Sequence, residues 1–218
     1  MPAEPGPPAS TGLPEWLQPL ATAASTVRAD AITRFSTVPD GVTARRSAVL
    51  IAISETVAGP SVLLLERAAR MRNHAGQVAF PGGAVDEADA DRTQTALREA
   101  NEEVGLRAES VEVIAVLPDL FLPPSSFLVT PVIAWWRGLH EVGVVDANEV
   151  ARVANVPIAE LANPSNRFRV THPSGFRGPG FAVSDLFVWG FTAGLLDALL
   201  RLGGWAQPWD ETVERPIP

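Results

Sequence analysis

Cysteine is absent from this chain of 218 residues, so the sequence excludes disulfide bonds and every mechanism that needs a thiol. Long apolar runs are absent as well, because no stretch reaches the roughly 18 apolar residues of a membrane-spanning helix. The first residues, MPAEPGPPASTG, lack the basic and apolar segments of a signal peptide. These absences suit a cytoplasmic protein, which is what we expect, with no membrane as a partner.

Positive charge is also scarce, because 17 basic residues stand against 25 acidic ones and the net charge is −8. A protein that follows nucleic acid phosphates would show a basic patch, so we expect no nucleic acid partner. An anionic small-molecule substrate would have to be met by local arginines and a metal rather than by the overall field. The sequence leaves the oligomeric state open, a homodimer included.

The residues that are present fit one globular domain, since 46% are apolar and 19% are charged. We predict a disordered tail over residues 1–12, a single domain over 13–204 and an irregular tail over 205–218. Within the domain, turn residues separate apolar runs that predict the strands 47–54, 61–67 and 127–136, the first two paired as a hairpin. Further predicted elements are a helix that begins near Pro19, a loop or hairpin over 163–180, and a C-terminal helix that begins at residues 189–193, ends at Gly203-Gly204 and has apolar residues that serve core packing.

A helix is predicted within residues 82–106, GGAVDEADADRTQTALREANEEVGL. Apolar residues recur there at steps of three and four, at Ala96, Leu97, Ala100 and Val104. Asp89 or Asp91 can cap its start, and Gly105 can supply the left-handed residue that ends it.

Three acids, Glu99, Glu102 and Glu103, lie about one turn apart on another face of this helix. Like charges at that spacing cost a few tenths of a kcal/mol each, and only Arg98 is near enough to offset them. Clustered carboxylates of this kind suit a hard divalent cation such as Mg²⁺, which takes oxygen ligands and is often shared with substrate phosphates.

The segment resembles the Nudix box, G-x5-E-x7-R-E-U-x-E-E-x-G-U, where U is aliphatic. The matching residues are Gly83, Arg98, Glu99, Glu102, Glu103, Gly105 and Leu106. Ala100 is small for its aliphatic position. The first acid is Asp89, with eight residues instead of seven before Arg98, so we expect Asp89 to cap the helix rather than to serve catalysis.

The residues before the box resemble L-L-x-x-R-S/A-x3-R-x3-G-x3-F-P-G-G, the pattern of the coenzyme A pyrophosphatase branch of Nudix hydrolases. The matching residues are Leu63, Leu64, Arg67, Ala68, Arg72, Gly76, Phe80, Pro81, Gly82 and Gly83. Two arginines and a glycine-rich turn beside a metal helix suit a ligand with several phosphates. Together the two resemblances cover roughly residues 45–203.

The resemblance implies an α/β (α+β) protein with the Nudix fold, a mixed β-sheet sandwiched between α-helices with the box helix against the sheet. It implies metal-dependent hydrolysis of the pyrophosphate bond of coenzyme A or an acyl-coenzyme A, with 3′,5′-ADP and (acyl-)4′-phosphopantetheine as products.

The resemblance also implies roles for individual residues. Mg²⁺ or Mn²⁺ would be bound by Glu99 and Glu103, completed by the Gly83 carbonyl, with Glu102 as a further ligand or general base and Arg98 orienting the glutamates. The candidate substrate contacts are Arg67, Arg72, Gly76, Phe80 and Gly82, with Arg72 assigned to phosphate, the 3′-phosphate of coenzyme A in particular.

Alternatives remain at this point. One is a Nudix enzyme for nucleoside triphosphates, ADP-ribose or NADH, against which the upstream pattern argues. Another is a non-catalytic Nudix-like regulator that binds a ligand, against which three mutually repelling acids argue. Glu149 is either a further acid of the site or a surface residue, and His74 is either a phosphate donor or solvated. Asp119 and the loop 120–126 either border the pocket or form a plain turn.

Overall fold

The computed structural model describes residues 12–33, 37–71, 75–123, 125–173 and 175–217 of the chain. Its main element is a sheet of eight strands with the central order β3-β2-β1-β7-β5, in which β4 also pairs with β1, β6 with β7 and β8 with β2. The strands are β1 (Arg45–Thr56), β2 (Gly59–Arg67), β3 (Val78–Ala79), β4 (Gly82–Ala84), β5 (Val111–Val116), β6 (Leu120–Leu122), β7 (Phe127–Trp136) and β8 (Val150–Pro157). β1 and β7 run parallel and the other pairs are antiparallel, so the sheet is mixed.

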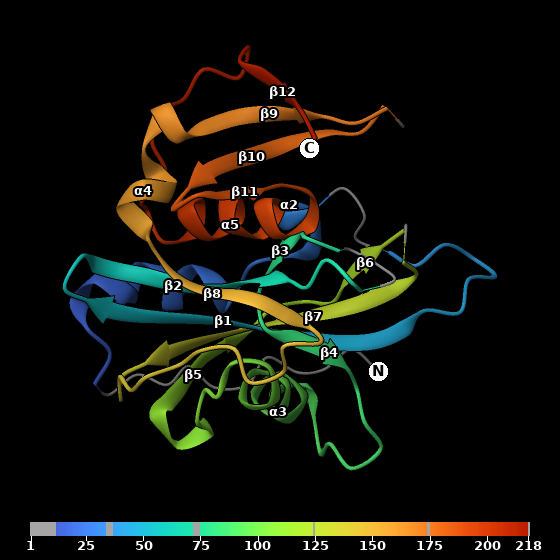
Figure 1. Cartoon of the computed structure of the whole chain (residues 1–218), viewed down its shortest axis with the longest axis vertical. Coiled ribbons are helices and arrows are strands. Elements are labelled where there is room, and N and C mark those ends of the chain that lie inside the picture. Colours follow the sequence, from blue (N-terminus) through green and yellow to red (C-terminus); the bar gives the residue numbers. More distant parts are fainter. Residues whose placement is uncertain (1–11, 34–36, 72–74, 124, 174, 218) are drawn as a thin grey trace.

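Helices cover both faces of this sheet, α3 (Arg92–Val104) on one and α5 (Gly190–Leu202) on the other (Figure 1). The strand sequences dictate this, because successive residues of a strand point to opposite faces. Leu50 and Ala52 of β1 lie in the apolar cluster under α3, whereas Ile51 and Ile53 lie in the cluster under α5. Strands that are apolar at every position therefore bury both faces of the sheet.

A smaller sheet of four strands, in the order β11-β10-β9-β12, lies on the side of α5 away from the large sheet (Figure 1). Its strands are β9 (Arg167–Thr171), β10 (Arg177–Val183), β11 (Leu186–Val188) and β12 (Glu214–Pro216). The remaining helices are α1 (Gln18–Ala24), α2 (Ala29–Ile32), α4 (Ile158–Ala162) and three 3-10 turns, Glu15–Leu17, Ala108–Ser110 and Pro164–Asn166. No helix in these described ranges is long and apolar enough to span a membrane.

The predicted fold class and the hairpin of the first two strands are confirmed. The segment 163–180 forms a hairpin, β9–β10. One difference concerns the C-terminal tail, which was predicted to be irregular: Glu214–Pro216 pairs in parallel with β9. The tail contains few apolar residues, so no apolar periodicity predicts the strand β12. This strand forms because the edge of β9 is open for pairing.

Candidate active site

The box helix α3 begins and ends as local rules require. The Asp91 carboxylate accepts a hydrogen bond from the Gln94 amide at 2.9 Å, and Gly105 ends the helix with φ of 74°. Ala96, Ala100 and Val104 are buried against the large sheet. The helix cap is therefore Asp91, which leaves Asp89 available for another contact.

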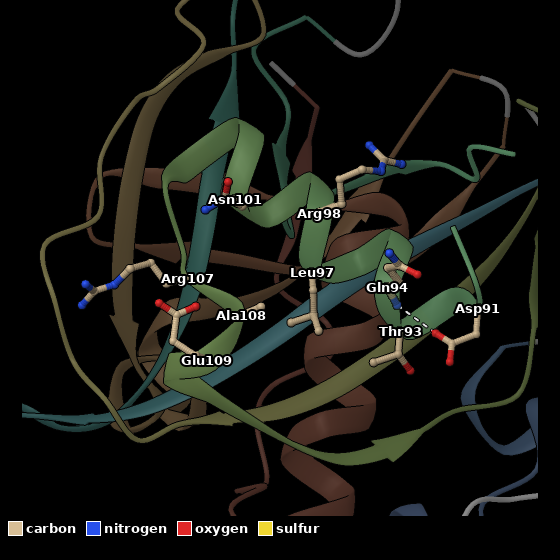
Figure 2. A pocket seen from close by; sticks show the side chains of 9 residues that line it. All are labelled: Asp91, Thr93, Gln94, Leu97, Arg98, Asn101, Arg107, Ala108 and Glu109. Atoms are coloured by element: carbon tan, nitrogen blue, oxygen red, sulfur yellow. Dashed lines mark hydrogen bonds between the residues drawn. The ribbon is translucent and has the colours of Figure 1, made fainter. Parts of the chain in front are cut away.

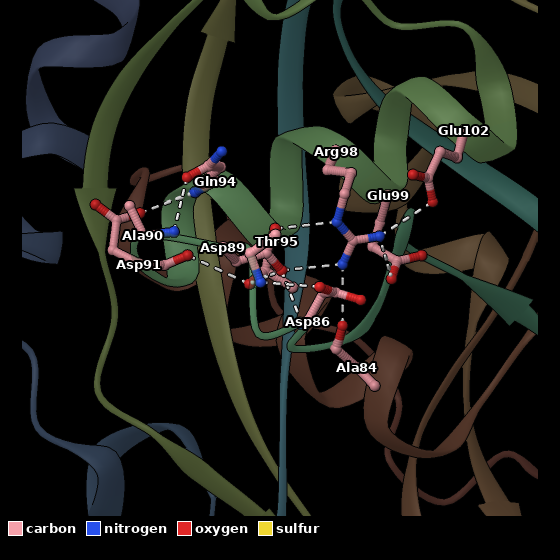
Figure 3. Close-up of polar contacts among 11 residues, drawn as sticks. Ala84, Asp86, Asp89, Ala90, Asp91, Gln94, Thr95, Arg98, Glu99 and Glu102 are labelled. Atoms are coloured by element: carbon pink, nitrogen blue, oxygen red, sulfur yellow. Dashed lines mark hydrogen bonds and ion pairs between the residues drawn. The ribbon is translucent and has the colours of Figure 1, made fainter.

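Asp89 binds Arg98, and this corrects the prediction that it caps the helix. Its two carboxylate oxygens accept hydrogen bonds from Nε and Nη2 of Arg98, both at 3.0 Å, and only 2% of its side chain is exposed (Figure 3). It also accepts from the Thr95 hydroxyl and the Asp86 amide, each at 2.9 Å. These contacts, led by Arg98, hold the pKa of Asp89 well below its usual value. Asp89 therefore acts as the anchor of Arg98.

Arg98 in turn orients two of the box glutamates. Its Nη1 donates to the carboxylates of Glu99 and Glu102, each at 3.0 Å, while Nη2 also donates to the Ala84 carbonyl at 3.1 Å (Figure 3). The contact with Asp89 is bidentate, which fixes the plane of the guanidinium. One arginine thus joins the loop before α3 to the acids on α3, in the orienting role that the sequence predicts.

Glu103 is the most deeply buried of the three glutamates, with 3% of its surface exposed. Its Oε2 accepts a hydrogen bond from the Gly82 amide at 2.9 Å. Burial raises the pKa of Glu103 to about 7, and the negative charges of Glu99 and Glu149 act in the same direction. Burial likewise raises the pKa of Glu99. Glu102 differs, because 58% of its side chain is exposed.

The two glycines of the F-P-G-G segment let β4 approach both β1 and α3. A Cβ on Gly82 would lie 2.4 Å from the Ala48 carbonyl oxygen, and one on Gly83 would lie 2.4 Å from the Glu99 carboxylate. A side chain on Gly82 would clash with backbone, whereas one on Gly83 would displace the Glu99 carboxylate. The backbone of β4 therefore forms the floor on which Glu99 and Glu103 rest.

Two residues from neighbouring strand ends complete the charged surroundings of these acids. Glu149 immediately precedes β8, and its negative charge raises the pKa of both Glu99 and Glu103, which places it beside the acids. Arg67, at the end of β2, lowers the pKa of Glu103. Its Nε is buried and has no hydrogen-bond partner among the described residues. An unpaired buried guanidinium atom is costly, and an anionic ligand would satisfy it.

Other predicted contacts have structural positions. Phe80 is a core side chain, 3% exposed, that packs in the apolar cluster next to β4, and a substrate contact through it stays a prediction. Gly76 has φ of 68° and donates its amide to the Arg67 carbonyl at 3.0 Å, which returns the chain toward β2. Arg72 and His74 lie outside the described residues.

A large cavity of about 960 Å³ opens beside Arg67. Leu120–Leu122, Pro123 and Ser125 line it, so this segment borders a pocket, whereas Asp119 is not part of its lining. The residues that sequence reasoning missed are Trp189, Gly190, Phe191, Thr192, Gly194 and Leu195, which were predicted to serve core packing and also line this cavity. An apolar residue on a helix gives no local sign that it borders a cavity.

A second, shallower hollow of about 660 Å³ lies against the outer side of α3 (Figure 2). Leu97, Asn101, Arg107 and Glu109 are among its lining residues, and Figure 2 shows the Asp91–Gln94 capping bond beside it. Neither Glu99 nor Glu103 lines this hollow. The acids do not line the large cavity either, but Arg67 does, and its charge acts on Glu103, so we take the acids, Arg67 and this cavity together as the candidate site.

Comparison with known proteins agrees with this geometry. The model of the NUDIX domain matches residues 44–173. The chain is 43% identical over 175 residues to an uncharacterized Nudix hydrolase, NudL, of Citrobacter koseri, which covers 73% of this chain and 83% of that protein. The protein of the same name from an Enterobacter species is 39% identical over 180 residues, 75% of this chain and 86% of that one. The chain therefore belongs to the Nudix hydrolase family.

Solved structures include a Nudix hydrolase of M. smegmatis, RenU, which aligns with a TM-score of 0.48 and 22% identity over 73% of this chain and 86% of that one. The family model and the NudL relatives confirm the predicted family, while the coenzyme A branch stays a prediction. Members of the family generally use divalent metal ions such as Mg²⁺ or Mn²⁺.

The donor set here fits such an ion, since Glu99 and Glu103 present carboxylate oxygens whose mutual repulsion a cation would relieve. Within the described ranges, however, no three Asp, Glu or His side chains are gathered closely enough to bind an ion by themselves. Water or substrate oxygens would have to supply the remaining ligands, as is usual for Mg²⁺.

Proposed function

We propose that this chain hydrolyses the pyrophosphate bond of coenzyme A or an acyl-coenzyme A with Mg²⁺ or Mn²⁺. Water adds its oxygen to one phosphorus, the bridging P–O bond breaks, and a proton is released. The products are 3′,5′-ADP and 4′-phosphopantetheine, acylated where the substrate was. The observation that carries the proposal is the buried, unpaired Nε of Arg67, a residue that lines a large cavity and whose charge acts on the Glu103 carboxylate.

Glu99 and Glu103 are the residues that would bind the metal. Both carboxylates rest on β4, so the sheet fixes their positions before any ligand arrives. A bound divalent ion would neutralise pyrophosphate oxygens and lower the pKa of a water molecule. Glu149 adds negative charge on the same side and is our candidate for a further acid.

Arg67 would bind the pyrophosphate itself. Its positive charge already acts on Glu103, and an anionic phosphate oxygen would supply the partner that Nε lacks. Charge-assisted bonds of this kind are about twice as strong as neutral ones. The site can therefore attract an anion locally although the whole chain carries a net charge of −8.

Glu102 is our candidate for the group that accepts the proton from water. It is more exposed than Glu99 and Glu103, and Arg98 holds it beside Glu99 through a shared Nη1. Arg98 is a positioning residue, because its guanidinium donates to protein groups, namely three carboxylates and a carbonyl.

The test is product analysis with purified protein, using coenzyme A, dephospho-coenzyme A, ADP-ribose, NADH and dNTPs, with Mg²⁺ or Mn²⁺ and with EDTA. We expect 3′,5′-ADP from coenzyme A and no turnover in EDTA. Unchanged turnover in EDTA would end the metal assignment, and turnover of dNTPs alone would end the coenzyme A assignment.

A matched pair of variants tests the role of Arg67. Arg67→Ala should raise KM for coenzyme A about tenfold or more, the loss expected for one charge-assisted contact. Arg70→Ala is the control, because Arg70 is an exposed neighbour whose guanidinium binds the Ala147 carbonyl. Equal effects of the two substitutions would contradict a phosphate-binding role for Arg67.

A further inference from the structure

The large cavity is lined by residues from three separate parts of the fold. Phe121 and Leu122 of β6 lie on one wall, Phe191 of α5 on another, and Phe176 and Pro179 of the β9–β10 hairpin on a third. Its volume of about 960 Å³ is at the upper end of the range of small-molecule sites. The space therefore exceeds what a pyrophosphate alone would need.

The cavity is continuous with the proposed phosphate site through Arg67, which is one of its lining residues. The same guanidinium acts electrostatically on Glu103, so Arg67 is the residue that the acids and the cavity have in common. A substrate whose phosphates bind Arg67 would extend one of its two ends into the cavity.

The chemistry of the cavity walls indicates which end of the substrate, the adenosine or the acyl chain, would enter the cavity. The charged residues of the lining are Arg67 and Arg177, and Arg177 is paired with Glu214 at 3.1 Å. The Thr192 hydroxyl donates to the Val78 carbonyl at 2.9 Å. A 3′-phosphorylated adenosine would place a doubly charged group and polar base edges against mostly apolar walls, which is unfavourable. An alkyl chain has no such groups to satisfy.

Gly194 leaves part of this space open. It lies within α5 and lines the cavity, and apart from the nearby backbone of α5 and its two chain neighbours no described atom lies within 4 Å of the position that a Cβ would occupy. A glycine inside a helix lowers stability relative to alanine, and here no close packing requires it. The missing side chain thus adds volume to the cavity.

We propose that the cavity is the binding site for the acyl chain of an acyl-coenzyme A and that Gly194 sets the chain length it accepts. This inference rests on the proposed function. The pantetheine arm would run from Arg67 into the cavity, where polar lining residues such as Gln77 and Ser125 suit its amides. The enzyme then favours apolar acyl-coenzyme A over free coenzyme A.

The kinetic test compares free, acetyl-, hexanoyl- and decanoyl-coenzyme A. Each fully buried methylene gives about a fourfold gain, so we expect kcat/KM to rise at least about tenfold from acetyl to decanoyl even with partial burial. Gly194→Leu should abolish this rise, so that kcat/KM falls much more for decanoyl-coenzyme A than for free coenzyme A, while Gly194→Ala should keep most of the rise. A flat series in the wild type, or an equal loss for every substrate in Gly194→Leu, would overturn the subsite.

A binding experiment separates this inference from the proposed function. Calorimetry in EDTA would compare S-decanoyl-4′-phosphopantetheine with 4′-phosphopantetheine, neither of which can be hydrolysed at a pyrophosphate. Tighter binding of the decanoyl compound, lost in Gly194→Leu, supports the subsite whether or not coenzyme A is a substrate. Equal binding of the two overturns the subsite even if coenzyme A is hydrolysed. Should Gly194→Leu fail to fold, Leu122→Trp fills the cavity from β6 and gives the same comparison.

Discussion

Replacing Glu103 with glutamine should make the protein more stable and less active at once. The side chain is 3% exposed, and its Oε2 accepts from the Gly82 amide at 2.9 Å. Glutamine keeps the shape and can still accept that hydrogen bond, while it removes the buried charge. The two properties should therefore change in opposite directions.

The stability change follows from the pKa of Glu103, which burial raises from 4.5 to about 7. A carboxyl group whose pKa is higher in the folded state than in the unfolded state destabilises the fold when it ionises. This cost is absent below pH 4.5, grows as the pH rises to 7, and then stays constant at roughly 3 kcal/mol. Because glutamine does not ionise, Glu103→Gln in EDTA should raise Tm by about 6–12 °C at pH 8 and change it little at pH 4.5.

The activity change follows from the proposed metal site. Loss of one charged ligand that contributes about 3 kcal/mol to the transition state lowers kcat by roughly 10²-fold for every substrate. The assays are thermal melts in EDTA at the two pH values and turnover with Mg²⁺.

Glu102→Gln is the control for stability, because the greater part of that side chain is exposed and its removal relieves no comparable burial. A Glu103→Gln variant that melts lower than the wild type at pH 8 would refute the electrostatic argument. Full activity in the same variant would refute the role of Glu103 in metal binding.

Three further predictions concern residues around the acids. Asp89→Asn should lower kcat about tenfold or more by loosening its ion pair, whereas Asp91→Ala should cost about 1 kcal/mol of stability and keep kcat, as denaturant melts and kinetics on both variants would check. Gly83→Ala should fold but lose at least about tenfold in kcat, because its Cβ would displace the Glu99 carboxylate; unchanged kcat would contradict this. Arg72→Ala should raise KM for coenzyme A much more than for dephospho-coenzyme A, and equal losses would exclude a 3′-phosphate contact.

Local signals predicted the box helix well, since its cap, its apolar stripe and its terminal glycine all act within a few residues. The role of Asp89 could not be found that way. The helix begins only at Arg92, so the extra residue is accommodated in the preceding turn, where the Asp86 amide binds the Asp89 carboxylate. That turn brings Asp89 to Arg98, and spacing counted along an ideal helix cannot anticipate it.

The cavity was not predictable for a different reason. Its walls come from segments far apart in the chain, as the bond from Thr192 to the Val78 carbonyl shows across 114 positions. Most of the wall residues are apolar and fit a core equally well, so the pattern favours packing. The cavity arises from the way α5 packs between the two sheets, and this tertiary arrangement is not visible in the sequence pattern.

The diglycine of β4 explains how the fold tolerates three neighbouring acids. Gly82 lies against a backbone carbonyl of β1 and gives its amide to Glu103, while Gly83 lies under the Glu99 carboxylate. The carboxylates are thus positioned by backbone that is already fixed in the sheet, and their repulsion cannot be relieved by moving apart. A fold that holds acids in this way remains under electrostatic strain until a cation or a proton arrives. For this reason Glu99 and Glu103, the two residues with a raised pKa, are also our candidates for the metal ligands.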